Sequence, residues 1–278
     1  SYTRRRLTSK TRLSMLTKSV IDRIIPVLQA ELQRALQLKA KGFPRPYFCS
    51  LLLSDEHGYN TWGSHGSLMR TTTKRRRNAF CDLRVGSYRY DQVTDGGLSD
   101  NDDDRESYSH SSLPTDDKDL YCLQVTLWRL AEAKYREALT DFSEKKAARV
   151  SSIDRNRKFA SFARTTPQNS CSYKSAESVD IAHWERYCKK ISDWTAGLEG
   201  TSDSWVEFDA SQETRIFVSS ESACVVQHRQ IYSLSVTLRK LTKHGNYIEQ
   251  ELVFNRSSQS ELPSPAELKR LVRIKHQQ

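Results

Sequence analysis

The chain has 278 residues, a length that suits one large domain or two ordinary ones. Hydrophobic residues make up 37% of it and charged residues 28%, which is polar for a globular protein but excludes a wholly disordered chain. The net charge is +10, and no stretch approaches the roughly 18 uncharged apolar residues that a membrane helix needs. A globular protein with no membrane partner is therefore expected.

The positive charge is concentrated near the N-terminus. Residues 1–47 hold eleven Lys and Arg against two acidic residues and supply +9, whereas residues 91–119 hold ten acidic residues against Arg105 and Lys118. This distribution predicts a nearly neutral body with a basic N-terminal arm and an acidic loop. We expect the arm to bind nucleic acid only non-specifically, through phosphate contacts that weaken steeply with salt.

The cysteines are scattered and form no C-x-x-C pair, which argues against a zinc ribbon or a thioredoxin-type redox site. They predict reduced thiols and a cytoplasmic protein. The six are Cys49, Cys81, Cys122, Cys171, Cys188 and Cys224.

Residues 11–40 have the apolar spacing of an amphipathic helix, in steps of three and four. We expect Pro26 to kink this helix or to divide it in two. Residues 47–54, 61–73 and 80–90 then read as three strands of an antiparallel meander. The segment Asp55-Glu56-His57-Gly58 is predicted to be the turn between the first two.

Residues 91–116 are predicted to be a solvated loop. Asp100, Asp102 and Asp104 imitate the start of a calcium loop, but Arg105 stands where Gly is needed and Ser111 where Glu is needed. The mismatch makes calcium binding a minor alternative to a solvated acidic run.

The clearest predicted helix spans residues 117–147, with Asp116, Asp117 and Asp119 in or near its first turn, where negative charge favours the helix dipole. Residues 148–178 lack periodicity and read as a linker. Residues 179–198 return to helix. A second group of strands follows at 205–209, 213–219, 230–241 and 247–254, with a short pairing around 223–227, and a last helix spans 265–274.

The two halves repeat one order, in which a helix precedes a strand meander and a second helix follows. This predicts an α+β fold of antiparallel sheet meanders with packed helices, in two similar helix-plus-meander units. The predicted division is a unit at 1–147, a linker at 148–178 and a second unit at 179–278. The alternative is one sheet built twice.

Motifs of catalysis are missing. The sequence has no H-E-x-x-H helix, no phosphate loop and no G-x-S-x-G elbow. His57 and His65 could face each other across a hairpin with Cys49 beside them, but polar turn histidines are favoured because no carboxylate partner is evident. His183, next to Trp184, is predicted to be a half-buried packing residue. No catalytic, cofactor-binding or metal-ligating residue is therefore predicted in this chain.

The basic run Lys74-Arg75-Arg76-Arg77 could bind phosphates. It could equally be the solvated end of a hairpin, or an edge strand protected from aggregation by its charge. Either of these two structural roles is favoured over phosphate binding, because interleaved aromatic residues for base stacking are missing.

Several segments, taken in order, resemble the TldD/PmbA-like metallopeptidases, the family also called modulator of DNA gyrase. Residues 29–35 and 44–48 resemble its opening helix and "PYF" segment, and residues 66–68 its small-residue turn. Residues 82–88 resemble its D-V-R-V-G-x-Y segment, residues 127–139 and 145–147 its next helix, residues 214–221 its T-R-x-x-x-N-S-E-G hairpin, and residues 232–236 the strand that follows. The joint order over about residues 25–275 carries the resemblance.

The sequence also departs from this family. Its zinc-binding H-E-x-x-x-H helix lies beyond the region matched, and the turn at residues 219–222 has Ser where the family has Asn and Gly. The resemblance implies the N-terminal, substrate-cleft or dimerisation region of a zinc metallopeptidase that acts on peptides. Zinc is then expected on a missing C-terminal domain or on a partner subunit.

The implied partners are a peptide substrate and a TldD/PmbA-like subunit, in a homo- or hetero-oligomer. The alternative is a non-enzymatic binding module for nucleic acid or an acidic partner.

Overall fold

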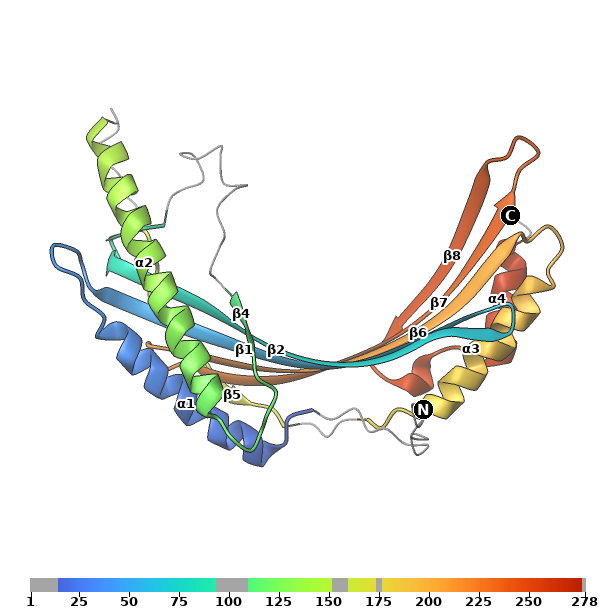
Figure 1. The fold of residues 1–278 in the computed structure, drawn as a ribbon, viewed down its shortest axis with the longest axis horizontal. Coiled ribbons are helices and arrows are strands. Elements are labelled where there is room, and N and C mark those ends of the chain that lie inside the picture. Colours follow the sequence, from blue (N-terminus) through green and yellow to red (C-terminus); the bar gives the residue numbers. More distant parts are fainter. Residues whose placement is uncertain (1–14, 94–109, 152–159, 174–176, 277–278) are drawn as a thin grey trace, which may run out of the picture.

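A long, strongly bent sheet forms the body of the molecule, and helices pack against both of its ends (Figure 1). The computed structural model describes residues 15–93, 110–151, 160–173 and 177–276. In these residues the sheet has eight strands in the order β3-β2-β1-β6-β7-β5, with β4 paired to β2 and β8 to β7. Neighbouring strands are antiparallel except β5 and β7. The predicted α+β class with an antiparallel sheet is confirmed.

Two hairpins of long strands make up most of the sheet. They are β1 (Pro46–Ser64) with β2 (Ser67–Ser87), and β6 (Asp203–Ser219) with β7 (Cys224–Leu241). β8 (Tyr247–Arg256) extends the second hairpin, and the short strands are β3 (Tyr90–Asp91), β4 (His110–Leu113) and β5 (Asn169–Cys171). Because β1 also pairs with β6, both predicted units contribute to one sheet. The boundaries of the predicted units stay predictions.

The predicted turn at residues 55–58 is wrong, because these residues lie in the middle of β1. The chain turns instead at His65 and Gly66, whose φ angles are 48° and 72°. Two successive positive φ values give the turn a twist that matches the flanking strands. Asp55 stays extended because its buried carboxylate binds Arg77 across the hairpin. The expected three strands are therefore two long ones, followed by the two-residue β3.

The strands of the second half are also longer than predicted. β6 runs without a break through residues 210–212, and β7 joins the separate segments expected at 223–227 and 230–241. Polar residues such as Gln212 interrupt the apolar pattern from which the strands were predicted. Gln212 is nevertheless fully buried, because its amide donates to the Glu177 carbonyl at 2.7 Å and to the Tyr232 hydroxyl at 3.1 Å.

The helices α1 (Lys18–Leu36) and α2 (Tyr121–Ser151) cover one end of the sheet. Pro26 lies inside one continuous α1 rather than between two helices. The predicted N-terminal part of this helix, residues 11–14, lies outside the described residues. The first hydrophobic cluster joins these helices to β1, β2 and β6, and includes Ile24, Leu28, Leu51, Leu53, Leu83, Leu127, Ala131 and Ile216.

The helices α3 (Ile181–Ala196) and α4 (Pro265–His276) cover the other end, together with the short 3-10 turn Gln259–Glu261. The Asp180 side chain caps α3 by accepting from the His183 backbone N–H at 3.0 Å. Trp184 stacks on Phe208 of β6, with ring centroids 3.8 Å apart and planes 3° apart. His183 contacts the Trp184 ring edge-on, with ring centroids 5.1 Å apart, but it is exposed, so the prediction of a half-buried residue is wrong. In the described part of the chain, no helix has the length and apolar character needed to cross a membrane.

Candidate binding face

The long strands give the sheet two different faces. On β1, alternate residues such as Leu53, Tyr59 and Thr61 are buried under the helices. Of these helices, α1, α3 and α4 lie on the convex side of the bent sheet in Figure 1. The residues of β1 between the buried ones point to the concave side. We call this second surface the open face; on β1 it is formed by Leu52, Ser54, Glu56, Gly58, Asn60 and Trp62.

The open face is covered at one end. There the Phe162 ring lies 4.8 Å from the Phe48 ring, between centroids, and 4.0 Å from the Arg84 guanidinium. Next to it an apolar row crosses the sheet through directly paired residues, Phe80, Leu52, Phe217 and Val225. Phe80 is 42% exposed. Large apolar side chains left at a surface are typical of binding surfaces.

A charged row lies four residues further along the strands, formed by Arg76, Glu56, Glu213 and Arg229. Arg76 donates to Glu56 at 3.1 Å. Burial raises the pKa of Glu213, but hydrogen bonds from Arg215 and Ser54 outweigh it and hold that pKa below its usual value. The carboxylates of Glu56 and Glu213 lie opposite each other on β1 and β6, and each is therefore paired with an arginine.

A polar cavity of about 220 Å³ opens on this face. Gly58 forms its floor because it has no side chain to fill the space between Lys74 and Ser211, its neighbours on the flanking strands. The lining consists of Glu56, Gly58, Tyr59, Asn60, Arg70, Thr72, Lys74, Arg76 and Asp209. Burial, and then Glu207 and Glu56, raise the pKa of Asp209, while Asn60 and Lys74 oppose the shift. The cavity thus combines a row of cations on β2 with acidic residues on β1 and β6.

The strand β2 divides the basic run predicted from sequence. Lys74 and Arg76 point to the open face, whereas Arg75 and Arg77 point to the helix side and bind acidic residues. The run is therefore not the solvated end of a hairpin, because the turn lies at residues 65 and 66. Over residues 67–76 no described strand pairs with the outer side of β2. The run instead lies on an edge strand that carries charge, which was the second form of the favoured interpretation.

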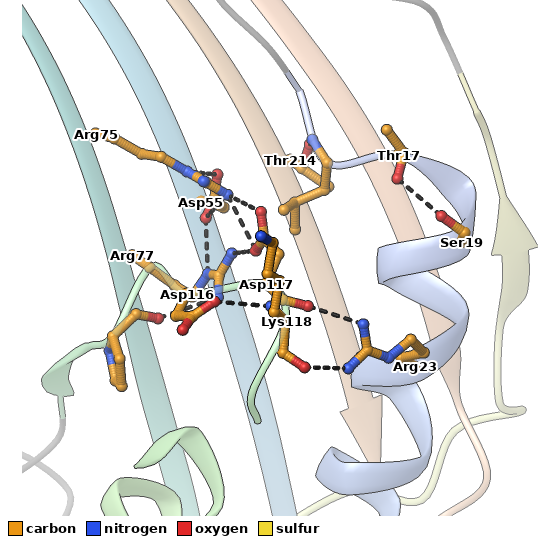
Figure 2. Close-up of polar contacts among 12 residues, drawn as sticks. Thr17, Ser19, Arg23, Asp55, Arg75, Arg77, Asp116, Asp117, Lys118 and Thr214 are labelled. Atoms are coloured by element: carbon orange, nitrogen blue, oxygen red, sulfur yellow. Dashed lines mark hydrogen bonds and ion pairs between the residues drawn. The ribbon is translucent and has the colours of Figure 1, made fainter. Parts of the chain in front are cut away.

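Figure 2 shows the buried ion cluster, which consists of Asp55, Arg75, Arg77 and Asp117. Arg77 Nε donates to Asp55 Oδ2 at 2.7 Å, and its second terminal nitrogen binds Asp117. Arg75 donates to both oxygens of Asp117, at 2.9 and 3.2 Å. The Arg77 and Asp55 side chains are almost completely buried. Burying charges is costly unless each one is paired, and here every charge has a partner.

The cluster also fixes the chain segment that enters α2. Arg77 donates to the Pro114 carbonyl at 3.0 Å, and Arg23 of α1 donates to the carbonyls of Asp117 and Lys118 at 2.9 and 2.7 Å (Figure 2). Asp117 therefore binds the two arginines instead of opening the helix, and α2 begins at Tyr121. The predicted helix start at residue 117 is therefore wrong, and of the three acidic residues expected in or near the first turn, Asp119 accepts from the Tyr121 backbone N–H at 2.9 Å.

We expect the stability of the protein to fall in acid through Asp117. Burial raises the pKa of Asp117, but hydrogen bonds and charge from Arg77 and Arg75 outweigh it and set that pKa below its usual value. An acid with a depressed folded-state pKa stabilises the fold above its unfolded pKa and loses this contribution as pH falls through the folded pKa. Asp117→Asn should therefore cost roughly 1–3 kcal/mol at pH 7 and weaken the dependence of stability on pH below about 4.

Urea unfolding from pH 3 to 7 measures this effect. The control is Glu199→Gln, which changes an exposed carboxylate with no hydrogen bond or ion pair to a described residue. An Asp117→Asn protein with the wild-type dependence on pH would show that the ion cluster does not couple stability to protonation.

The outer strand β8 leaves a second free edge. Its exposed apolar residues, at the hairpin tip and along the strand, are Leu241, Tyr247, Ile248 and Val253. No described strand pairs with the outer side of β8. Unpaired backbone groups and apolar side chains are the features by which a sheet edge associates with another chain.

Few of the side chains weighed from sequence come together. His57 lies within β1 opposite Arg75, while His65 lies in the turn, so they do not face each other across a hairpin. Asp100, Asp102 and Asp104 lie outside the described residues, as does the basic arm up to residue 14. Among the residues that the structure describes, no three His, Cys, Asp or Glu side chains gather as metal ligands.

The cavity over Gly58 was not predicted from the sequence, because a glycine between polar residues indicates a turn.

No family model and no curated protein matches this chain in sequence. Solved structures do match it. A candidate modulator of DNA gyrase from Bacteroides thetaiotaomicron has a TM-score of 0.50 and 11% identity, over 91% of this chain and 50% of that one. A second candidate modulator, from Thermotoga maritima, has a TM-score of 0.47 and 9% identity, over 91% of this chain and 46% of that one.

A third structure, TldE from Thermococcus kodakarensis, has a TM-score of 0.48 and 7% identity, over 90% of this chain and 46% of that one. This chain therefore spans about half the length of each of these proteins. The likeness to the Bacteroides protein shows that the chain has a TldD/PmbA-like fold.

Proposed function

We propose that this chain is the N-terminal, substrate-cleft or dimerisation region of a TldD/PmbA-like zinc metallopeptidase. The fold carries the proposal: 91% of this chain superposes on one half of the Bacteroides protein. The resemblance of segments along residues 25–275 agrees with it. The catalytic chemistry then belongs to a part of the enzyme that lies outside this chain, and we expect the enzyme to work in the cytoplasm.

The described residues do not fit a zinc site, because they bring together no group of three metal-ligating side chains. The role of this region would be to bind the peptide. A peptide that joins a sheet edge receives main-chain hydrogen bonds along its length, and the neighbouring side chains select its sequence. The open face and the free edges of β2 and β8 offer such positions.

The edge of β8 supports the oligomeric part of the proposal. Its exposed apolar residues would be covered by a second chain, either another copy or a TldD/PmbA-like partner, and its outer backbone groups would gain hydrogen bonds. The peptide-binding and subunit-binding roles can thus be assigned to different edges of one sheet.

The alternative, a module for nucleic acid, has less support. The open face mixes the cations Arg70, Lys74 and Arg76 with the acidic Glu56 and Asp209 in one cavity. Carboxylates among the cations repel phosphates, and a nucleic-acid surface is typically a basic patch. Salt-sensitive, non-specific binding by the basic arm stays the prediction for nucleic acid.

Complementation tests the proposed function. The chain should bind no stoichiometric zinc and hydrolyse no peptide alone. Mixed with a catalytic chain that carries the H-E-x-x-x-H motif from the same genome, it should form a complex and raise peptide hydrolysis at least tenfold. The catalytic chain alone and the mixture with a zinc chelator are the controls. Tightly bound zinc in the isolated chain, or a mixture no more active than the catalytic chain alone, would contradict the proposal.

A further inference from the structure

The edge of β2 over residues 67–76 combines two features. Its outer backbone groups have no strand partner among the described residues. Its side chains on the open face include Arg70, Lys74 and Arg76, all exposed. Charged side chains keep such an edge from pairing with another copy of itself, but they attract a strand of opposite charge.

Two of these cations are available for binding. Arg76 is paired with Glu56. Arg70 forms no hydrogen bond or ion pair with a described residue, and neither does Lys74, although the charge of Lys74 acts on Asp209. Arg75, on the other face, is held in the buried ion cluster. The edge therefore presents positive charge only towards the concave side.

We propose that the edge of β2 over residues 67–76 binds an extended acidic peptide as an added strand, with Asp or Glu at alternate positions opposite Arg70, Lys74 and Arg76. This inference rests on the proposed function, because it names the peptide class that this region holds. Side chains on one face of a strand repeat every two residues, about 6.8 Å apart. Alternate acidic residues of the added strand would therefore meet the cations on the same face.

The acidic residues of the open face favour a peptide over a nucleic acid. An added strand lies about 4.8 Å from β2 but roughly 14 Å from β6, because neighbouring strands are evenly spaced. Its carboxylates would thus meet the cations of β2 at short range and Asp209 only at long range. A phosphate backbone lying across the open face would meet Glu56, Glu207 and Asp209 directly.

Binding of a labelled peptide to the intact chain tests the inference. The probe is a nine-residue peptide that alternates Thr and Glu, and the same peptide with Lys in place of Glu is the charge control. The Glu peptide should bind, and its affinity should fall with salt. Arg70→Ala combined with Lys74→Ala should weaken binding about tenfold or more, since one exposed charge pair contributes up to about fivefold.

Arg229→Ala serves as the matched control that should bind normally. It removes an exposed cation of the same face, on β7, far from the edge of β2. A loss of binding in Arg229→Ala as large as that in the double variant would show that the peptide lies across the open face instead of along the edge of β2, and would overturn the inference.

N-methylation separates strand addition from simple charge attraction. In an antiparallel strand, the N–H groups of alternate residues point to the same side. Methylating all Glu nitrogens or all Thr nitrogens should therefore abolish binding in one peptide and leave it in the other. Equal binding by both peptides would overturn the inference, as would an unrelated single-stranded oligonucleotide that binds more tightly through Arg70 and Lys74.

These outcomes are independent of the complementation experiment. If the chain activates the catalytic subunit but does not bind the acidic peptide, only this inference is disproved. A chain that binds the peptide but activates no catalytic subunit disproves the proposed function.

Discussion

Replacing Asp55 with alanine should destabilise the protein by about 3–5 kcal/mol, the cost of removing one partner from a buried ion pair. Asp55 is 1% exposed and accepts from both Arg77 and Arg75. The variant leaves the buried Arg77 guanidinium with Asp117 as its only carboxylate partner among the described residues. Urea unfolding at pH 7 measures the change in free energy.

Glu56→Ala is the matched control for this prediction. Glu56 is the next residue of the same strand, and it also pairs with an arginine of β2, but on the open face. Exposed pairs of this kind contribute about 0.2–1 kcal/mol. If both variants lost the same small amount of stability, the cluster in Figure 2 would not be a buried determinant of the fold.

Trp184→Ala should cost about 3–5 kcal/mol, as is usual when a large aromatic side chain is removed from a core. The Trp184 ring stacks on the fully buried Phe208, and its indole N–H donates to Gln259 at 2.9 Å. The variant opens a cavity between α3 and β6 and leaves the Gln259 oxygen without this donor. Urea unfolding is again the measurement.

Trp128→Ala controls for the loss of a tryptophan. Trp128 lies on α2, is 46% exposed, and contacts the Arg34 guanidinium at 5.4 Å from its ring centroid. We expect this variant to lose less than about 1 kcal/mol, because surface substitutions seldom cost more. A larger loss than that of Trp184→Ala would mean that the cluster under α3 adds less to stability than its burial indicates.

Helices were predicted well from sequence because each buries one stripe at the helical period. Leu28 and Leu32 of α1, and Leu127 and Ala131 of α2, are buried as this period requires. The ends were less accurate where side chains had distant partners. Asp117 shows the reason, because its arginine partners lie far away in the sequence, on β2.

Strand lengths and the binding face were not predictable in the same way. When only their neighbours in sequence are considered, Asp55 and Gly58 resemble turn residues, and Gln212 lies in a gap between two predicted strands. In the fold, Asp55 and Gln212 have buried partners, and Gly58 opens a cavity. The charges of the run at residues 74–77 were visible, but their division between two faces depends on a strand register set by the turn at residues 65 and 66.

The place of β1 between β2 and β6 has a consequence for synthesis on the ribosome. The first hairpin and α1 emerge early, but β6 begins only at Asp203. The side of β1 that pairs with β6 therefore stays unpaired while the residues between these strands are synthesised. Contacts so distant in sequence form slowly, and an unpaired strand edge can associate with another nascent chain. Ser54, Glu56 and Asn60 make this strand polar on its open face, which lowers its tendency to aggregate until β6 arrives.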